Sequence, residues 1–530
     1  MDCTCLRHTE LPGTTKLFAD FVYHYDRLSD FYSHNPWDPG AFHAAAAEIA
    51  YPEDRRAALV AALAPINPGN SLLGKLAQPN TVAVVTGQQV GLFSGPAYTI
   101  YKALTAVRLA RYLEEQGLAA VPVFWLATQD HDFEEIRHSW TFDASHRPVR
   151  LSVEKSGPEG APVGTLPLPD LPLAALKEAL AALPFGDDVV GLVEAAYRPG
   201  RTHGEAFRRL LASLLPDVEL LFVDPMLPAL RELAAPLLSE ALTQAPELSA
   251  AIAWRGIALA ERGYHAQVHF DEHTSLVFLL ENGRRQSLKR HGREYLLGGR
   301  KIAAAELADR AADLSPNALL RPVVQDYLLP TVAYVGGPAE LAYLAQSEVL
   351  YRHLLRRMPV ALPRSGFTLF DHRAYKLLRR YEIGGCTNPL ADFFQGEEHL
   401  RNRIASVLIP KQIQASMESA RGSVRSSVDR LLADLHSFDP TLAAALEVSR
   451  RKIGYQLDKA EGKIRREAVR RDERASSDAA YLAGLVYPEG HLQERFYSIL
   501  PFLARHGVDL AGRIYENVRL ACPDHQILSI

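Results

Sequence analysis

Three consecutive residues, Asp130, His131 and Asp132, place two carboxylates beside an imidazole. Carboxylates next to a histidine can raise its pKa, hold one tautomer or bind a divalent cation, so the cluster is a candidate for acid–base catalysis. The alternative is a structural role, because Asp132 and Glu135 have the spacing of a helix capping box. We interpret the three residues as catalytic and predict no resident metal site.

A second candidate is TVAVVTGQQVGLFSGPAYTIYK, residues 81–102, in which an apolar run passes through a glycine-rich loop into a helical pattern. Backbone N–H groups and the positive end of a helix meet in such a loop, which suits a phosphate or a carboxylate. The loop matches neither GxGxxG nor the P-loop, so an ordinary strand–helix turn is the alternative, as is a solvated lysine at position 102. The candidate binding residues are Gly87, Gln88, Gln89, Gly91, Ser94, Gly95 and Lys102.

The segment 315–343 repeats this arrangement, because Gly336-Gly337-Pro338 joins another apolar run to a helix that begins with proline. Polar residues before the turn are three to five apart, so they could share a helix face or form an internal ion pair. Arg364 could bind phosphate or carboxylate through its planar guanidinium, with a surface arginine as the alternative. The further candidates are Asn317, Arg321, Gln325, Asp326, Gly336, Gly337, Glu340 and Tyr343.

The apolar runs before these residues predict the sheet that positions them. They occupy residues 81–86, 121–127, 218–223, 331–335 and 360–362, and helical patterns separate them. Continuous apolar strands alternating with helices indicate a parallel sheet covered on both faces, and therefore an α/β fold. Ligands of such sheets bind beyond the carboxyl ends of the strands, where the candidate residues stand.

The predicted core spans residues 1–395, with two insertions at about 140–200 and 265–315. In residues 396–476, apolar residues recur three and four apart on both sides of a proline-containing break, which predicts an antiparallel helical coiled coil. Its second arm is basic, and we favour a solvated helix face over a nucleic-acid contact. Residues 477–530 are amphipathic and are predicted to return to the core as a helical segment.

Composition narrows the class of protein. The 530 residues are 48% hydrophobic and 23% charged with a net charge of -4, which is typical of a soluble globular protein and disfavours a nucleic-acid partner. No run reaches the roughly 18 apolar residues of a membrane span, and the N-terminus lacks a signal-peptide core, so we expect a cytoplasmic protein without membrane contact. Cys3, Cys5 and His8 could ligate a metal, but four cysteines in so long a chain favour reduced thiols.

Four blocks of sequence carry a resemblance to a known family. They are TGQQVGLFSGPAYTIYKALT, PVFWLATQDHDFEEI, SPNALLRPVVQDYLLPTVAYVGGPAELAYLAQ and LPRSGFTL. With these blocks the chain closely resembles, nearly from end to end, the bacillithiol biosynthesis cysteine-adding enzymes, which are the BshC family of cysteine ligases. One position departs from the expected pattern, because Gln129 stands where an acidic residue is expected before Asp130.

The resemblance implies a Rossmann-like core with two connecting-peptide insertions, distantly related to class I aminoacyl-tRNA synthetases, and a coiled coil that supports a homodimer. It implies that cysteine is joined by an amide bond to the amine of glucosaminyl malate, with ATP and Mg²⁺ and no other cofactor. Amide formation needs an activated carboxylate, either an acyl adenylate or an acyl phosphate. The glycine-rich loop would then hold a phosphate or a substrate carboxylate, and His131 or Asp132 would act on the amine. Arg321, Asp326 and Glu340 would orient malate and sugar hydroxyls. These roles are hypotheses that follow from the placement of the residues at strand ends and not from the resemblance.

Two other functions stay open at this level. One is a class I synthetase-like enzyme that transfers nucleotidyl groups or acts on tRNA, although the sequence contains neither HIGH nor KMSKS. The other is a non-catalytic assembly protein, in which the core only binds a ligand and the coiled coil dimerises.

Overall fold

The five predicted apolar runs form one sheet in the computed structural model. Its order is β13-β12-β2-β3-β6, and every neighbouring pair is parallel. The strands are β2 (Val82–Gln88), β3 (Ala120–Leu126), β6 (Leu221–Val223), β12 (Thr331–Gly336) and β13 (Val360–Pro363). The predicted α/β class with a parallel sheet is confirmed.

The structure describes residues 3–292, 294–381, 383 and 391–530. The chain divides into two compact units. The larger unit comprises Asp2–Thr368 and Glu494–Leu528, and it contains the parallel sheet. The smaller unit consists mainly of Leu369–Gln493. The predicted domain limits at residues 395 and 476 stay a prediction.

Strand order places a crevice beside β2. From β2 the chain moves outward through β3 to β6, and it later returns to the other side of β2 as β12. Loops that leave β2 and β12 therefore run to opposite faces, which opens a gap between them at the carboxyl ends of these strands. The two predicted glycine turns follow these two strands.

Alternating side chains of β2 build a core on each face of the sheet. Val82 and Val84 pack in a cluster that includes residues of α5 (Tyr98–Glu115). Ala83 and Val85 belong to a second cluster that includes residues of α13 (Pro338–Leu354). Because both faces of β2 are covered, the whole strand is apolar until it reaches the crevice.

The larger unit carries further strands outside this sheet. β4 (His138–Phe142) and β5 (Pro148–Ser152) form an antiparallel pair, and β1 (Cys3–Leu6) pairs with β15 (His525–Ser529). A separate antiparallel sheet has the order β10-β9-β8-β7-β11. Its strands are β7 (Thr274–Glu281), β8 (Arg284–His291), β9 (Glu294–Leu297), β10 (Arg300–Ala303) and β11 (Leu314–Pro316). Asn282 and Gly283 join β7 to β8 with φ values of 54° and 71°, the left-handed conformation of a tight hairpin turn.

Helices surround these sheets. Those before the first insertion are α1 (Lys16–Tyr23), α2 (Ala41–Ala47), α3 (Glu53–Leu63) and α4 (Leu72–Leu76). Those between β5 and β12 are α6 (Leu173–Leu180), α7 (Gly186–Ala196), α8 (His203–Leu214), α9 (Pro228–Thr243), α10 (Ala245–Glu261), α11 (Ala304–Asp309) and α12 (Arg321–Leu328). Near the C-terminus follow α19 (Gln493–Phe496), α20 (Leu500–His506) and α21 (Leu510–Tyr515).

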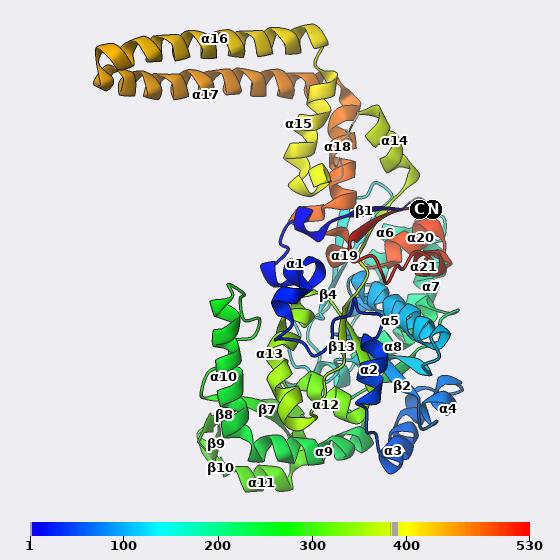
Figure 1. Cartoon of the computed structure of the whole chain (residues 1–530). Coiled ribbons are helices and arrows are strands. Elements are labelled where there is room, and N and C mark those ends of the chain that lie inside the picture. Colours follow the sequence, from blue (N-terminus) through cyan, green and yellow to red (C-terminus); the bar gives the residue numbers. More distant parts are fainter. Residues whose placement is uncertain (1–2, 293, 382, 384–390) are drawn as a thin grey trace. The chain divides into compact units, whose positions relative to one another are not determined.

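The smaller unit is helical. After β14 (Phe367–Phe370), its helices are α14 (His372–Arg380), α15 (Glu397–Leu408), α16 (Lys411–Phe438), α17 (Pro440–Arg471) and α18 (Glu473–Val486). Figure 1 shows α16 and α17 as a long antiparallel pair, which confirms the predicted helical hairpin. Asp439 separates them, and its carboxylate caps α17 by accepting a hydrogen bond from the Thr441 amide.

The basic arm of this hairpin is partly neutralised by acidic side chains. Arg450 of α17 pairs with Asp429 of α16, and Arg421 of α16 pairs with Asp458 and Glu461 of α17. These contacts favour the solvated helix face over a nucleic-acid site. Across the described part of the chain, no helix combines the length and the apolarity that crossing a membrane requires.

Candidate active site

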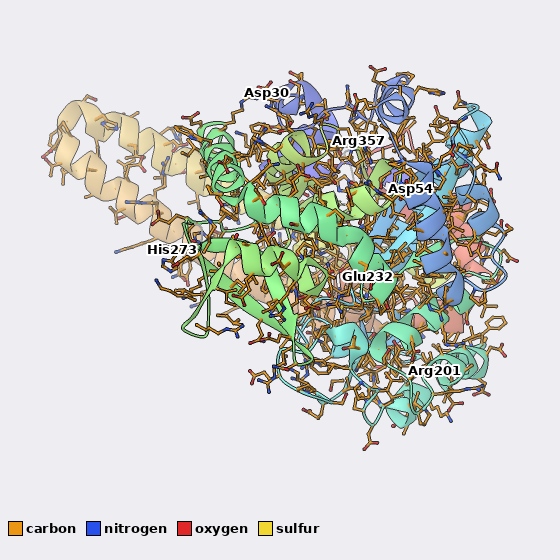
Figure 2. The ribbon with its side chains drawn as sticks, turned by 90° about the horizontal axis from the view of Figure 1, so that it is seen from below. Asp30, Asp54, Arg201, Glu232, His273 and Arg357 are labelled. Atoms are coloured by element: carbon orange, nitrogen blue, oxygen red, sulfur yellow. The ribbon has the colours of Figure 1, made fainter. Side chains whose placement is uncertain are left out.

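A cavity of about 1560 Å³ lies at the carboxyl ends of β2, β3 and β12. Its walls come from the loops after these strands and from β7 and β8, and His273, which Figure 2 labels, is one of the lining residues. Such a position is the usual ligand site of an open parallel sheet. The predicted residues that line it are Gly87, Gln88, Gln89, Gly91, Lys102, Asp130, His131, Asp132, Asn317, Arg321, Gly337, Glu340, Tyr343 and Arg364.

The other five predicted binding residues are not part of this lining; they are Ser94, Gly95, Gln325, Asp326 and Gly336. Asp326 is completely buried and accepts hydrogen bonds from Tyr351 and Gln325, while burial raises its pKa. A residue five positions along a helix is rotated by about 140°, so Asp326 faces the core although Arg321 faces the cavity.

Packing explains part of the glycine content of the loop after β2. A Cβ atom at Gly87 would lie 2.7 Å from the Trp125 carbonyl oxygen of β3, and one at Gly91 would lie 3.0 Å from the Gly95 Cα. The Ala97 amide before α5 donates to the Tyr497 carbonyl. These glycines therefore let two strands and a turn approach closely, and their number alone does not identify a phosphate site.

The loop after β3 holds the predicted catalytic cluster. The Asp130 carboxylate accepts hydrogen bonds from Gln89 Nε2 at 2.7 Å and from the His131 amide at 2.7 Å. Burial opposes ionisation of Asp130, but the adjacent His131 side chain, the bond from Gln89, the charge of Arg285 and the bond from the His131 amide outweigh it and hold its pKa well below the usual value. Asp130 is therefore ionised near neutral pH and places a negative charge at this edge of the sheet.

Arg285 of β8 reaches this cluster from the inserted antiparallel sheet. Its Nη1 lies 3.0 Å from His131 Nδ1 and 3.5 Å from an Asp130 oxygen. Burial, partly offset by the charge of Asp130, lowers the pKa of Arg285 to about 10. The guanidinium therefore remains charged near neutral pH and ties the insertion to the end of β3.

Glu135 is the second carboxylate that Gln89 contacts. Gln89 Nε2 donates to Glu135 as well as to Asp130, and Glu135 also lines the cavity. Burial raises the pKa of Glu135, and the negative charges of Asp130 and Asp132 raise it further. A carboxylate whose pKa moves toward neutrality is a better proton acceptor, so Glu135 joins the candidates for acid–base chemistry.

Lys102 of α5 is held inside the protein. Its ammonium donates to the Gly87 carbonyl at 2.9 Å and to Gln88 Oε1 at 2.8 Å, and it forms an ion pair with Glu340. An ammonium has three N–H donors, so these partners use all of them. A direct bond from Lys102 to a bound anion would have to replace one of these contacts.

Glu340 completes this buried cluster at the start of α13. Its carboxylate also accepts hydrogen bonds from the Gly337 amide at 2.8 Å and from the Tyr334 hydroxyl at 2.6 Å. Burial opposes its ionisation, but Lys102 and these donors keep the pKa of Glu340 below its usual value. The Gly336-Gly337-Pro338 turn is thus fixed to the end of β2 through one ion pair.

Two arginines line the same side of the cavity. Arg321 donates to Gln325 Oε1 at 3.0 Å and to the Tyr343 hydroxyl at 2.7 Å. Arg364 forms a bidentate pair with Glu494, at 2.9 and 2.6 Å. Burial opposes the charge on Glu494, but Arg364 outweighs it and lowers the pKa of Glu494 to about 2. Arg364 is predicted from the sequence to bind a phosphate or a carboxylate of a ligand. In the structure its guanidinium pairs instead with Glu494, a carboxylate of the protein itself.

The cavity is therefore divided by charge. Asp130, Asp132 and Glu135 stand beyond β3, on one side of β2. Arg321 precedes β12, on the other side, where the exposed Arg495 also lines the cavity. Other charges at the cavity are paired within the protein: Lys102 with Glu340, Arg364 with Glu494 and Arg285 with Asp130. A ligand with an amine at one end and carboxylates or phosphates at the other matches this division.

Family comparisons also divide the chain into two parts, although residues 494–528, which belong to the larger structural unit, fall in the second part. Residues 1–365 match the model of the N-terminal Rossmann-like domain of bacillithiol biosynthesis BshC, and residues 367–530 match that of its C-terminal coiled-coil domain. The chain belongs to the BshC family. This membership confirms the resemblance carried by the four sequence blocks, and it makes the chain an enzyme of the ligase class.

Several curated relatives of this BshC-family chain bear the name "Putative cysteine ligase BshC". The relative from Solibacter usitatus is 54% identical over 530 residues, which is 100% of both chains. The relative from Koribacter versatilis is 33% identical over 99% of both chains, and that from Salinibacter ruber is 32% identical over 97% of this chain and 96% of its own. A solved structure titled as an arginyl-tRNA synthetase from Campylobacter jejuni aligns at 10% identity with a TM-score of 0.22, too low to bear on fold or function.

The sequence predictions missed Arg285, Glu135 and Arg495, which line this BshC-family cavity, and Glu494, which pairs with the lining residue Arg364. Arg285 stands beside Arg284 in a strand, and nothing local distinguishes the two arginines. Glu135 has the capping-box spacing from Asp132, which indicates a structural role. Glu494 is 130 positions from its partner Arg364. Of these residues, only Glu135 could have been found from the sequence, because it follows the Asp130 cluster closely.

Proposed function

We propose that this protein joins the carboxyl group of L-cysteine to the amine of glucosaminyl malate, the last step of bacillithiol biosynthesis, at the expense of ATP. The observation that carries the proposal is the division of one cavity into an acidic and a basic side. The names of the curated relatives support cysteine as the acyl donor. Because ATP and cysteine are substrates, we place the reaction in the cytoplasm.

The acidic side suits the attacking amine. An amine arrives as an ammonium ion, which the negative charge of Asp130 attracts. It must lose a proton before it can attack, and Glu135 has the pKa shift and the position to accept that proton. The amine nitrogen then bonds to the activated acyl carbon, and the phosphate-bearing group departs with the electron pair of the broken C–O bond.

The basic side suits the malate carboxylates and the phosphates. Two of the five N–H donors of Arg321 are used by Gln325 and Tyr343, which leaves others for a ligand. Arg495 is exposed at the same side. ATP would supply activation of the cysteine carboxylate, either as an adenylate or as an acyl phosphate.

A magnesium ion fits this cavity only together with phosphates. Among the residues that the structure describes, no group of three or more histidine, cysteine or acidic side chains could enclose a metal. Mg²⁺ commonly takes one or two protein carboxylates and completes its shell with phosphate and water oxygens. Asp132, which lines the cavity, is the residue that would hold such an ion.

We also propose that the helical hairpin forms a homodimer. Apolar side chains on both arms are exposed in the single chain, and uncovered apolar surface marks an interaction site. These residues are Ile413, Leu431, Leu442, Val448 and Ile453.

The deciding experiment incubates the purified protein with ATP, L-cysteine and glucosaminyl malate and measures the new thiol by mass spectrometry after alkylation. The nucleotide product identifies the activated intermediate: AMP indicates that the cysteine carboxylate formed an acyl adenylate, and ADP indicates an acyl phosphate. Product that depends on all three substrates is the expected result. Normal binding of the substrates without product would favour the assembly protein, and salt-sensitive tRNA binding would favour the synthetase-like enzyme.

A further inference from the structure

Arg285 contacts the imidazole of His131 through a guanidinium that is itself fixed in place. Its Nε donates to Ser315 Oγ at 3.1 Å, and its Nη2 donates to the Pro316 carbonyl at 2.7 Å. The guanidinium carbon lies 3.8 Å from the centre of the Phe278 ring. The side chain is only 8% exposed, so Nη1 is held toward His131.

A guanidinium has N–H donors and no acceptor. At 3.0 Å from Arg285 Nη1, His131 Nδ1 must therefore present a lone pair. The other neighbour of Nδ1 is an Asp130 oxygen at 3.6 Å, too far for a hydrogen bond. A neutral imidazole carries one proton, and with Nδ1 bare that proton resides on Nε2.

We propose that Arg285 is a positioning residue that keeps the proton of neutral His131 on Nε2, so that His131 donates a hydrogen bond into the cavity and does not accept the proton of the amine. This inference rests on the proposed function, because the amine is that of the proposed reaction. From the sequence, either His131 or Asp132 could act on the attacking amine. The inference assigns His131 instead to the carbonyl oxygen of the activated cysteine.

An Nε2–H donor has a use in amide formation. When the amine attacks the activated acyl carbon, the carbonyl oxygen gains negative charge, and a donor held in advance stabilises that charge. His131 lines the cavity with 39% of its side chain exposed, so it is accessible to such an oxygen. Proton acceptance then falls to the carboxylates of the same loop, of which Glu135 is already a candidate.

The first test reads the tautomer directly. Histidine-¹⁵N labelled protein is examined by long-range ¹H–¹⁵N correlation, and His131→Asn identifies the His131 signals. The expected spectrum shows a protonated Nε2 and a bare Nδ1. A protonated Nδ1 in the wild-type protein would overturn the inference, and this readout does not depend on ligase activity.

The second test compares Arg285→Met, Arg285→Lys and Arg284→Met. Arg284 is the matched control, because it is the adjacent residue of β8, is exposed and carries the same charge. Arg285→Met is expected to lower kcat about 100-fold with KM changed less than about threefold, the effect of losing one preorganised donor. Arg285→Lys, which keeps a donor, should recover part of the rate, and Arg284→Met should match wild type.

The two failures are distinguishable. If no variant and no wild-type sample makes product, the proposed function fails while the NMR spectrum still decides the tautomer. If wild type is active and Arg285→Met retains full kcat with the same His131 spectrum, the positioning role is refuted. A thermal melt of each variant separates loss of fold from loss of rate.

Discussion

Replacing Lys102 by methionine tests the buried ion pair beneath the cavity. The Lys102 side chain is 3% exposed and that of Glu340 is 18% exposed, so the change removes a positive charge next to a carboxylate largely withdrawn from water. Removing one partner of a buried pair costs about 3–5 kcal/mol. Glu340 retains its bonds from Gly337 and Tyr334, so we expect about 3 kcal/mol, a change of about 150-fold in the folding equilibrium of the larger unit.

Urea denaturation followed by tryptophan fluorescence measures this change. All four tryptophans, Trp37, Trp125, Trp140 and Trp254, belong to the larger unit, so the signal reports on that unit alone. The matched control is Lys177→Met, because Lys177 pairs with Glu194 at 2.6 Å on the surface. That exposed pair should contribute less than about 1 kcal/mol.

The loss should depend on pH. The pKa of Glu340 is lower in the folded protein than in the unfolded chain, so its contribution is present above the unfolded value and is lost as pH falls through the folded value. The difference between wild type and Lys102→Met should therefore shrink in acid. If Lys102→Met costs no more than Lys177→Met at neutral pH, the ion pair is not buried as described and the reasoning fails.

Three further predictions concern catalysis, stability and assembly. Glu135→Gln should lower kcat by about 10²- to 10⁴-fold in the thiol assay, whereas Glu232→Gln, on the exposed face of α9 (Figure 2), should leave it unchanged; equal rates for both variants would exclude Glu135 as the base. Arg364→Met should destabilise the larger unit by about 3–5 kcal/mol in urea denaturation, because it leaves the buried charge of Glu494 unpaired. Adding Glu494→Gln removes that charge and should recover part of the loss. A double variant less stable than Arg364→Met would contradict the pairing. Leu431→Glu should reduce the mass measured by light scattering from dimer to monomer, and an unchanged dimer would place the contact elsewhere.

The sequence by itself determined the local elements. Continuous β-branched runs such as those at 81–86 and 331–335 can be buried only as central strands, and the spacing of apolar residues in 411–471 is that of paired helices. The carboxyl ends of parallel strands meet at one edge, so residues that follow the strands, such as Asp130–Asp132 and Gly337, are predicted to lie there, and they line one cavity. Each of these features follows from residues that are close together in the sequence and from the common direction of parallel strands.

Tertiary structure decided which of these side chains face the ligand. Asp326 was assigned to the cavity with Arg321, but a rotation of about 140° along α12 turns it into the core. Arg285 and Arg284 are equivalent in sequence, and only the pleat of β8 and its pairing with β7 direct Arg285 to His131. Arg364 was expected to bind a ligand, yet Glu494 from far along the chain pairs with it. Contacts between distant segments carry no local pattern, because they depend on the packing of whole elements.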